Sequence, residues 1–81
     1  MRNELIKEIR YYLGMTQHEF AEWLGVNYST IAAVETNYRN VSDKLAAKIA
    51  LKFDVTDPEF LAYRERRAKT RKYFEDASKR S

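Results

Sequence analysis

Hydrophobic side chains recur at helical spacing in two short neighbouring segments of the chain. They are Phe20, Ala21 and Leu24 in the first segment and Ile31 and Val34 in the second. Apolar residues that repeat with this period indicate amphipathic helices. Gly25 lies between the segments, where a tight turn requires the left-handed backbone that glycine adopts without strain. The pattern therefore predicts two short helices, near 17–24 and 28–35, set at an angle about one turn.

The polar positions of these two segments suit contact with nucleic acid. Thr16 and Asn27 stand where the helices begin, and both residue types cap helices with their side-chain oxygens. The outward positions of the second helix are short, uncharged or hydroxyl-bearing, namely Tyr28, Ser29, Thr30 and Ala33. Such a face fits the base edges in the major groove of DNA. The spacing is that of a DNA-reading helix-turn-helix.

Three further helices are predicted around this pair. Asn3 is expected to cap a first helix over about 3–13. Ser42 begins a fourth helix, and Asp57 followed by Pro58 begins a fifth that has no strong stop signal. Two glycines and one proline leave few breaks in the chain, so the expected fold class is all-α.

The composition restricts the class of protein further. The 81 residues suffice for one compact core, and no cysteine is present for disulfides or thiolate zinc sites. Neither a membrane-spanning apolar stretch nor a signal peptide occurs, so we expect a soluble, cytoplasmic protein. The sequence has no nucleophile elbow, glycine-rich phosphate loop or carboxylate cluster. We therefore expect a binding protein rather than an enzyme, without cofactor or metal, and assign no metal or proton role to the single histidine, His18.

Positive charge is concentrated toward the C-terminal end of the chain. Residues 1–57 carry seven Lys/Arg against eight acidic residues, a net charge of −1, whereas residues 58–81 carry eight against four, a net charge of +4. A basic segment of this kind suits nucleic acid, and it is also typical of a solvated helix end. We expect a DNA-binding domain over 1–61 and a basic helical extension over 62–81.

A series of short motifs between Ile6 and Leu61 resembles a known family. The motifs are Ile9-Arg10, Gly14-Met15-Thr16-Gln17, Phe20-Ala21, Leu24-Gly25-Val26, Ser29-Thr30-Ile31, Glu35, Ile49-Ala50 and Phe53-Asp54-Val55. They resemble the phage-repressor helix-turn-helix domain (Cro and cI-like, XRE-type) of lambda-repressor-like fold. The resemblance implies a compact domain of four to five helices that binds double-stranded DNA. It also implies a structural ion pair between Arg10 of the first helix and Glu35 at the end of the third.

The resemblance further implies which residues meet DNA. Bases would be faced by Tyr28, Ser29 and Ala33. Phosphates would be contacted by Thr16, Gln17, Asn27, Thr30, Thr36, Tyr38, Arg39, Asn40 and Lys44. For Thr30 a helix cap is the alternative, and for Arg39 and Lys44 a solvated surface charge. Tyr28 and Ala33 replace glutamines that often read adenine in this family, so the base preference does not transfer.

Four large side chains are candidates for contact with a partner or with a second copy of the chain. They are Trp23, Phe60, Tyr63 and Phe74. Trp23 lies on the polar side of its helix, so it is either an exposed hot spot or is covered by the C-terminal helix folding back. Phe60 and Leu61 are also expected to complete the core. The aromatic and basic stripe beyond them is a dimer contact, a phosphate-tracking arm or a frayed end.

These observations favour one function and leave two alternatives. We expect a sequence-specific, double-stranded DNA-binding transcriptional regulator that acts as a homodimer and reads the major groove with the helix near 28–35. Repression by blocking a promoter is the default mechanism, in a bacterium, a phage or a mobile element. The first alternative is a protein-interaction module, namely an antitoxin, an anti-repressor or an inhibitor of a host protein. The second is RNA binding by the arginine-rich tail.

Overall fold

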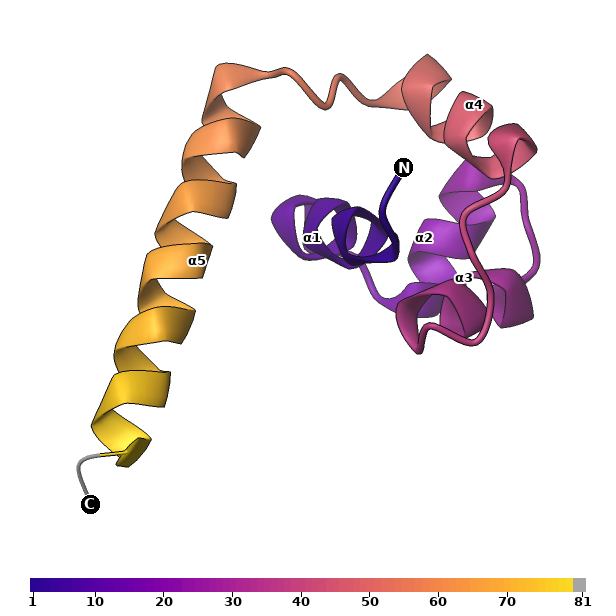
Figure 1. Cartoon of the computed structure of the whole chain (residues 1–81). Helices are drawn as coiled ribbons and strands as arrows, with labels where there is room; N and C mark the ends of the chain where they lie inside the picture. Colours follow the sequence, from indigo (N-terminus) through magenta and orange to yellow (C-terminus); the bar gives the residue numbers. More distant parts are fainter. Residues whose placement is uncertain (80–81) are drawn as a thin grey trace.

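Five helices form the computed structural model, which describes residues 1–79 and the side chains up to residue 74 (Figure 1). The helices are α1 (Asn3–Leu13), α2 (Gln17–Leu24), α3 (Tyr28–Glu35), α4 (Asp43–Lys52) and α5 (Pro58–Lys79). No strand occurs among the described residues, so the all-α prediction is confirmed. The end of the predicted basic extension, 80–81, lies outside the described residues.

Helices α2 and α4 begin at the polar caps that the sequence predicts. At the start of α2, the backbone N–H of Glu19 donates to Thr16 Oγ1 at 3.1 Å, while Thr16 N–H donates to the Glu19 carboxylate at 2.9 Å. At the start of α4, Leu45 N–H donates to Ser42 Oγ at 3.1 Å. Each bond satisfies a backbone N–H that the first helical turn leaves without an intrahelical partner.

The caps predicted at Asn3 and Asn27 need correction. Asn27 occupies the N-cap position of α3, but its side chain makes no capping hydrogen bond. For α1 the N-cap is Arg2, and Asn3 is the first helical residue. The Asn3 side chain crosses to the α3–α4 loop, where it donates to the Arg39 carbonyl at 2.9 Å and accepts from Val41 N–H at 3.2 Å. Asn3 therefore satisfies loop backbone groups that would otherwise compete for water.

Left-handed residues end three of the helices. Gly14 and Gly25 follow α1 and α2 with φ angles of 70° and 72°. Asn37 adopts a φ of 62° just after α3, a conformation that asparagine tolerates better than most residues. The tight turn at Gly25 sets α3 at an angle to α2, as the hydrophobic pattern predicts.

The core draws on all five helices. Its buried members are Ile6, Ile9, Phe20, Ala21, Leu24, Ile31, Val34, Leu45, Ile49 and Phe60. Phe60 at the start of α5 lies edge-on to Tyr12 and Phe53, with ring centroids 5.3 Å and 4.9 Å apart. Tyr12 is thus part of an aromatic cluster at the rim of the core. Leu61, which was expected in the core, is 44% exposed because it follows Phe60 on the next helical position and faces solvent.

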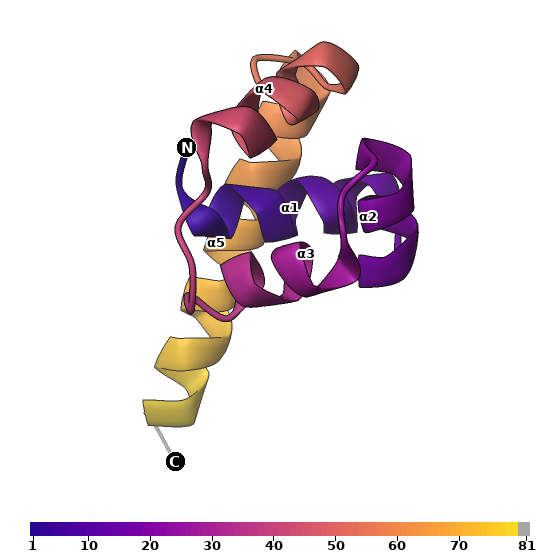
Figure 2. The same cartoon turned by 90° about the vertical axis from the view of Figure 1, so that its right-hand side faces the viewer.

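Helix α5 packs against α1 near its start and then continues past the other helices (Figures 1 and 2). Arg64 forms an ion pair with Glu8 of α1, and the Arg67 guanidinium lies 4.6 Å from the centre of the Tyr11 ring. The helix is continuous through residues 61 and 62, so the predicted division at that point coincides with no structural break. None of the five described helices is both long enough and apolar enough to span a bilayer.

Candidate nucleic-acid interface

Helix α3 presents a small polar face on the side opposite to its packing face. Ile31 and Val34 are fully buried where α3 packs against α1 and α2. Tyr28 is 42% exposed, Ser29 is exposed, and Ala33 is half-buried. These three are the residues predicted to face bases, and they remain available to a ligand on the outer side of α3.

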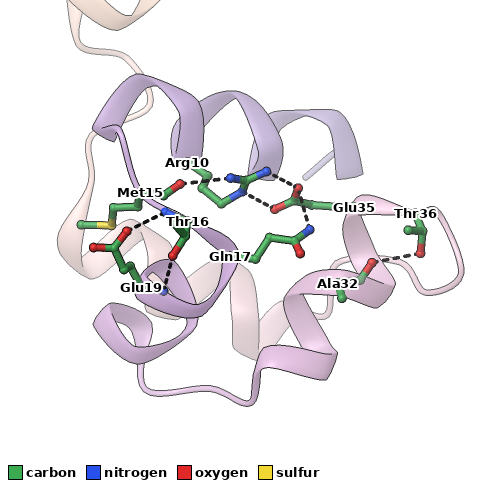
Figure 3. Close-up of polar contacts among 8 residues, drawn as sticks. All are labelled: Arg10, Met15, Thr16, Gln17, Glu19, Ala32, Glu35 and Thr36. Carbon is green, nitrogen blue, oxygen red and sulfur yellow. Dashed lines mark hydrogen bonds and ion pairs between the residues drawn. The ribbon is translucent and has the colours of Figure 1, made fainter.

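A bidentate ion pair fixes the far end of α3 to α1 (Figure 3). Arg10 Nε and Nη2 donate to the two carboxylate oxygens of Glu35 at 2.7 Å and 2.8 Å, and Arg10 Nη1 donates to the Met15 carbonyl at 3.0 Å. The hydrogen bond to Glu35 raises the pKa of the Arg10 guanidinium above its ordinary value. The predicted pair is therefore confirmed, and it also holds the turn between α1 and α2.

Gln17 at the start of α2 joins the same network. Its Nε2 donates to Glu35 Oε1 at 3.2 Å, which places the side chain beside the buried pair (Figure 3). An amide nitrogen carries two hydrogens, so one remains for a phosphate oxygen. The Thr16 hydroxyl accepts from Glu19 N–H and keeps its own hydrogen for donation. Both residues thus retain donors that suit the predicted phosphate contacts at the N-terminus of α2.

A basic hollow lies beside the other end of α3. It measures about 320 Å³, and its cationic rim consists of Arg39, Lys44 and Lys48. Asn27 and Thr30 from the start of α3 also line it. Lys48 Nζ donates to the Gly25 carbonyl at 3.1 Å, which orients it toward the turn between α2 and α3. Three cations and two helix N-termini around one hollow favour a phosphate group.

Comparison with known proteins decides the family of this arrangement. The Helix-turn-helix family profile matches residues 6–60, which is most of the chain. The chain belongs to the XRE-type helix-turn-helix family. A relative from Archaeoglobus fulgidus, named an uncharacterized HTH-type transcriptional regulator, is 40% identical over 60 residues, which cover 74% of this chain and 84% of the relative. No solved structure matches the chain significantly.

Within this helix-turn-helix domain, the remaining predicted phosphate contacts are spread along the α3–α4 loop. The Thr36 hydroxyl donates to the Ala32 carbonyl at 2.9 Å, so it completes the end of α3 and keeps only acceptor capacity (Figure 3). Tyr38 is 90% exposed, and Asn40 is exposed. Tyr38 and Asn40 do not line the basic hollow, whereas Arg39 does.

Lys48 is a candidate contact that the sequence interpretation missed. It lies one helical turn after Lys44 on α4, so the two ammonium groups share one face of the helix. That spacing was the available signal. It points to the domain only once the turn at Gly25 is known to lie against α4.

The predicted partner residues fall into different environments. Trp23 is half-buried, with its ring centre 5.8 Å from that of Phe20, and Lys52 Nζ of α4 lies 5.3 Å from the Trp23 ring. Its cover is therefore α4, which corrects the expectation that the C-terminal helix folds over it. Phe60 has no exposed surface, so it cannot contact a second chain directly. Tyr63 is half-buried against the core, whereas Phe74 is 62% exposed on α5.

His18 contacts the recognition face, a role that the sequence interpretation did not assign. The imidazole of His18 on α2 stacks on the Tyr28 ring of α3, with centroids 3.9 Å apart and planes inclined by 6°. No spacing rule joins these two residues, because the contact depends on how the turn at Gly25 directs α3. Among the described residues, no cluster of three or more His, Cys, Asp or Glu side chains suits a metal ion.

Proposed function

We propose that this chain is a sequence-specific, double-stranded DNA-binding transcriptional regulator that inserts α3 into the major groove. Membership in the helix-turn-helix family supports DNA binding, and the name of the archaeal relative supports a regulatory role. The observation that carries the proposal is the basic hollow formed by Arg39, Lys44 and Lys48 next to the start of α3. Cations in that position hold a phosphate strand while α3 faces the bases.

The two phosphate-binding regions lie on either side of the reading face. Thr16 and Gln17 approach α3 from α2, as the contact between Gln17 and Glu35 indicates. The basic hollow approaches from α4, with Thr30 of α3 in its wall. Between them, Ser29 and Ala33 offer a hydroxyl and a methyl group to base edges. A face of this chemistry combines hydrogen bonding with contact to thymine methyl groups.

We further propose that the regulator acts as a homodimer and represses by covering a promoter. One such domain reads a short half-site, and a twofold pair places two recognition helices about 34 Å apart on a palindromic operator. The bacterial, phage or mobile-element origin stays a prediction. The alternative of a protein-interaction module depended on an exposed Trp23, and its half-buried position against Phe20 and Lys52 does not favour it.

Selection of bound duplexes from a random DNA library tests this function. We expect a recurrent, palindromic sequence and a preference for it over scrambled DNA in titrations. Ser29→Ala should reduce binding to the selected site by about 1 to 3 kcal/mol and leave binding to scrambled DNA nearly unchanged. Lys44→Gln should weaken both duplexes by a similar factor, because phosphate contacts position the protein without specifying sequence.

Lys52→Gln is the matched control for Lys44→Gln. Both variants lose one positive charge from α4, but Lys52 lies about 12 Å further along the helix, at the end away from the basic hollow. It should bind both duplexes almost as well as the unmodified protein. Equal losses for the two lysine variants would argue against the hollow as a phosphate site. Absence of any preferred sequence would overturn the proposed function.

A further inference from the structure

The His18–Tyr28 stack is a surface feature that the core does not require. His18 is the second residue of α2 and Tyr28 is the first residue of α3. Both side chains are exposed, and neither belongs to the hydrophobic core. Their rings are nevertheless nearly parallel, with centroids 3.9 Å apart. The two helices therefore meet at the reading face through an aromatic pair that packing alone does not explain.

Stacking restricts Tyr28 in the way that base reading requires. A free tyrosine at the start of a helix can rotate about two side-chain bonds, and fixing such a side chain on binding costs conformational entropy. The imidazole face limits the Tyr28 ring to one plane before DNA arrives. Among the described residues, no hydrogen bond engages the Tyr28 hydroxyl or the His18 ring nitrogens. Stacking thus holds the ring while leaving its polar groups for a ligand.

We propose that His18 is a positioning residue for sequence reading, which fixes the Tyr28 ring so that its hydroxyl meets one operator base pair in a single orientation. The inference rests on the proposed function, because it presumes that α3 reads a duplex. It adds a residue of α2 to the specificity of a helix that reads DNA through α3. Without His18, Tyr28 samples several orientations, and the preference for the correct base pair falls.

A purely structural stack makes a different prediction. If His18 served only to hold α2 against α3, its loss would lower the stability of the fold and weaken binding to every duplex alike. The start of α2 already has the Thr16–Glu19 capping box, and Gln17 is bonded to Glu35. Buried Phe20 and Leu24 hold the rest of the helix. The fold therefore has little need of the exposed ring pair.

A double-mutant cycle on the full chain separates the two roles. The variants are His18→Ala, Tyr28→Ala and the double variant, each titrated with the selected duplex and with a scrambled duplex. His18→Ala should reduce the preference for the selected duplex about threefold to tenfold, as expected for loss of one aromatic pair. In the Tyr28→Ala background the same change should have almost no effect, since there is no ring left to position. His18→Phe keeps a stacking face and should restore the preference.

A second measurement follows the stack itself in the free protein. The His18 ring protons lie over the Tyr28 face, so their NMR resonances should be displaced by its ring current and should return toward ordinary positions in Tyr28→Ala. Equal effects of His18→Ala in both backgrounds, or equal losses on both duplexes, would overturn the inference while leaving the proposed function intact. A chain that selects no sequence from the library would overturn both.

Discussion

Arg10 and Glu35 illustrate how one residue pair supports the reading face from behind. Their side chains are 10% and 3% exposed, so both charges depend on each other and on a few nearby groups for solvation. Glu35 accepts from Arg10 twice and from Gln17 once. Because α3 ends at Glu35, the pair determines where the recognition helix lies relative to α1. Removing one partner leaves the other charge poorly solvated.

We expect Arg10→Met to lower the free energy of unfolding by about 3 to 5 kcal/mol, since it leaves the Glu35 carboxylate buried with Gln17 as its remaining side-chain donor. The double variant Arg10→Met/Glu35→Leu should recover much of this loss, because an apolar pair carries no desolvation cost. Urea unfolding followed by circular dichroism measures both. Strictly additive losses in the cycle would contradict the coupling that the geometry implies.

At this scale the sequence predicts pairs that a family pattern contains and misses those that depend on chain path. The resemblance placed Arg10 opposite Glu35, and the structure confirms the bond. The Asn3 side chain was predicted as a cap, yet it bonds to a loop more than thirty residues away. His18 and Tyr28 meet only because the turn at Gly25 directs their helices together. Such contacts have no local signal, since they arise from tertiary packing.

At the scale of elements, the start of α2 combines a helix end with a phosphate-binding position. The capping box joins Thr16 and Glu19 through two reciprocal hydrogen bonds. The backbone N–H of Thr16, followed by its side chain, lowers the pKa of the Glu19 carboxyl below its ordinary value of 4.5. The unfolded chain therefore binds more protons at this group than the folded chain when the pH lies between the two pKa values. The sign of the effect follows: acid weakens this helix start.

We expect the Glu19 contribution to stability to be complete above pH 4.5 and to be lost as the pH falls through the lowered pKa of the folded state. Glu19→Gln keeps an acceptor for Thr16 N–H without a titrating group. The difference in free energy of unfolding between the unmodified protein and Glu19→Gln should therefore shrink in acid. Asp54 titrates identically in both proteins and cancels. A difference that does not change with pH would contradict the assignment.

Thr16→Val tests the other half of the capping box. It removes the hydroxyl acceptor for Glu19 N–H, and the free energy of unfolding should fall by about 0.5 to 2 kcal/mol. Thermal unfolding at neutral pH measures this loss. Thr56→Val is a suitable control, because its hydroxyl also bonds a nearby group, the Asp54 carboxylate, but lies outside α2. An undisturbed melting temperature in Thr16→Val would show that the box adds nothing to the helix.

Element boundaries were more predictable than element contacts. Thr16, Ser42 and Pro58 act on their own neighbours in the chain, so the starts of α2, α4 and α5 follow from local sequence. The cover of Trp23 by α4 and the exposure of Leu61 depend on how helices cross. Periodicity identifies which face of a helix is apolar, but it does not identify which neighbour covers that face.

At the scale of the whole molecule, α5 has two parts with different surroundings. Phe60, Tyr63 and Arg67 pack against the core or α1, whereas Tyr73 and Phe74 lie beyond that contact. Figure 2 shows the helix extending past α1 and α3 toward the C-terminus. Tyr73 and Phe74 form an edge-on pair with centroids 5.7 Å apart, and both remain exposed. Exposed aromatic rings on a projecting helix favour contact with a second copy of the chain.

We therefore expect Tyr73→Ser/Phe74→Ser to convert the proposed dimer into a monomer and to weaken operator binding, because two recognition helices are no longer held on one palindrome. Sedimentation equilibrium measures the mass. Arg71→Gln/Lys72→Gln, on the adjacent positions, is the matched control and should retain the dimer. If instead the charge variant lowers the log–log salt slope of DNA binding by about 0.9 per lost phosphate contact while the aromatic variant keeps its mass, α5 tracks phosphates rather than joining protomers. Point substitutions are preferable to truncation after Leu61, since that truncation also removes Tyr63, Arg64 and Arg67 from their contacts with α1.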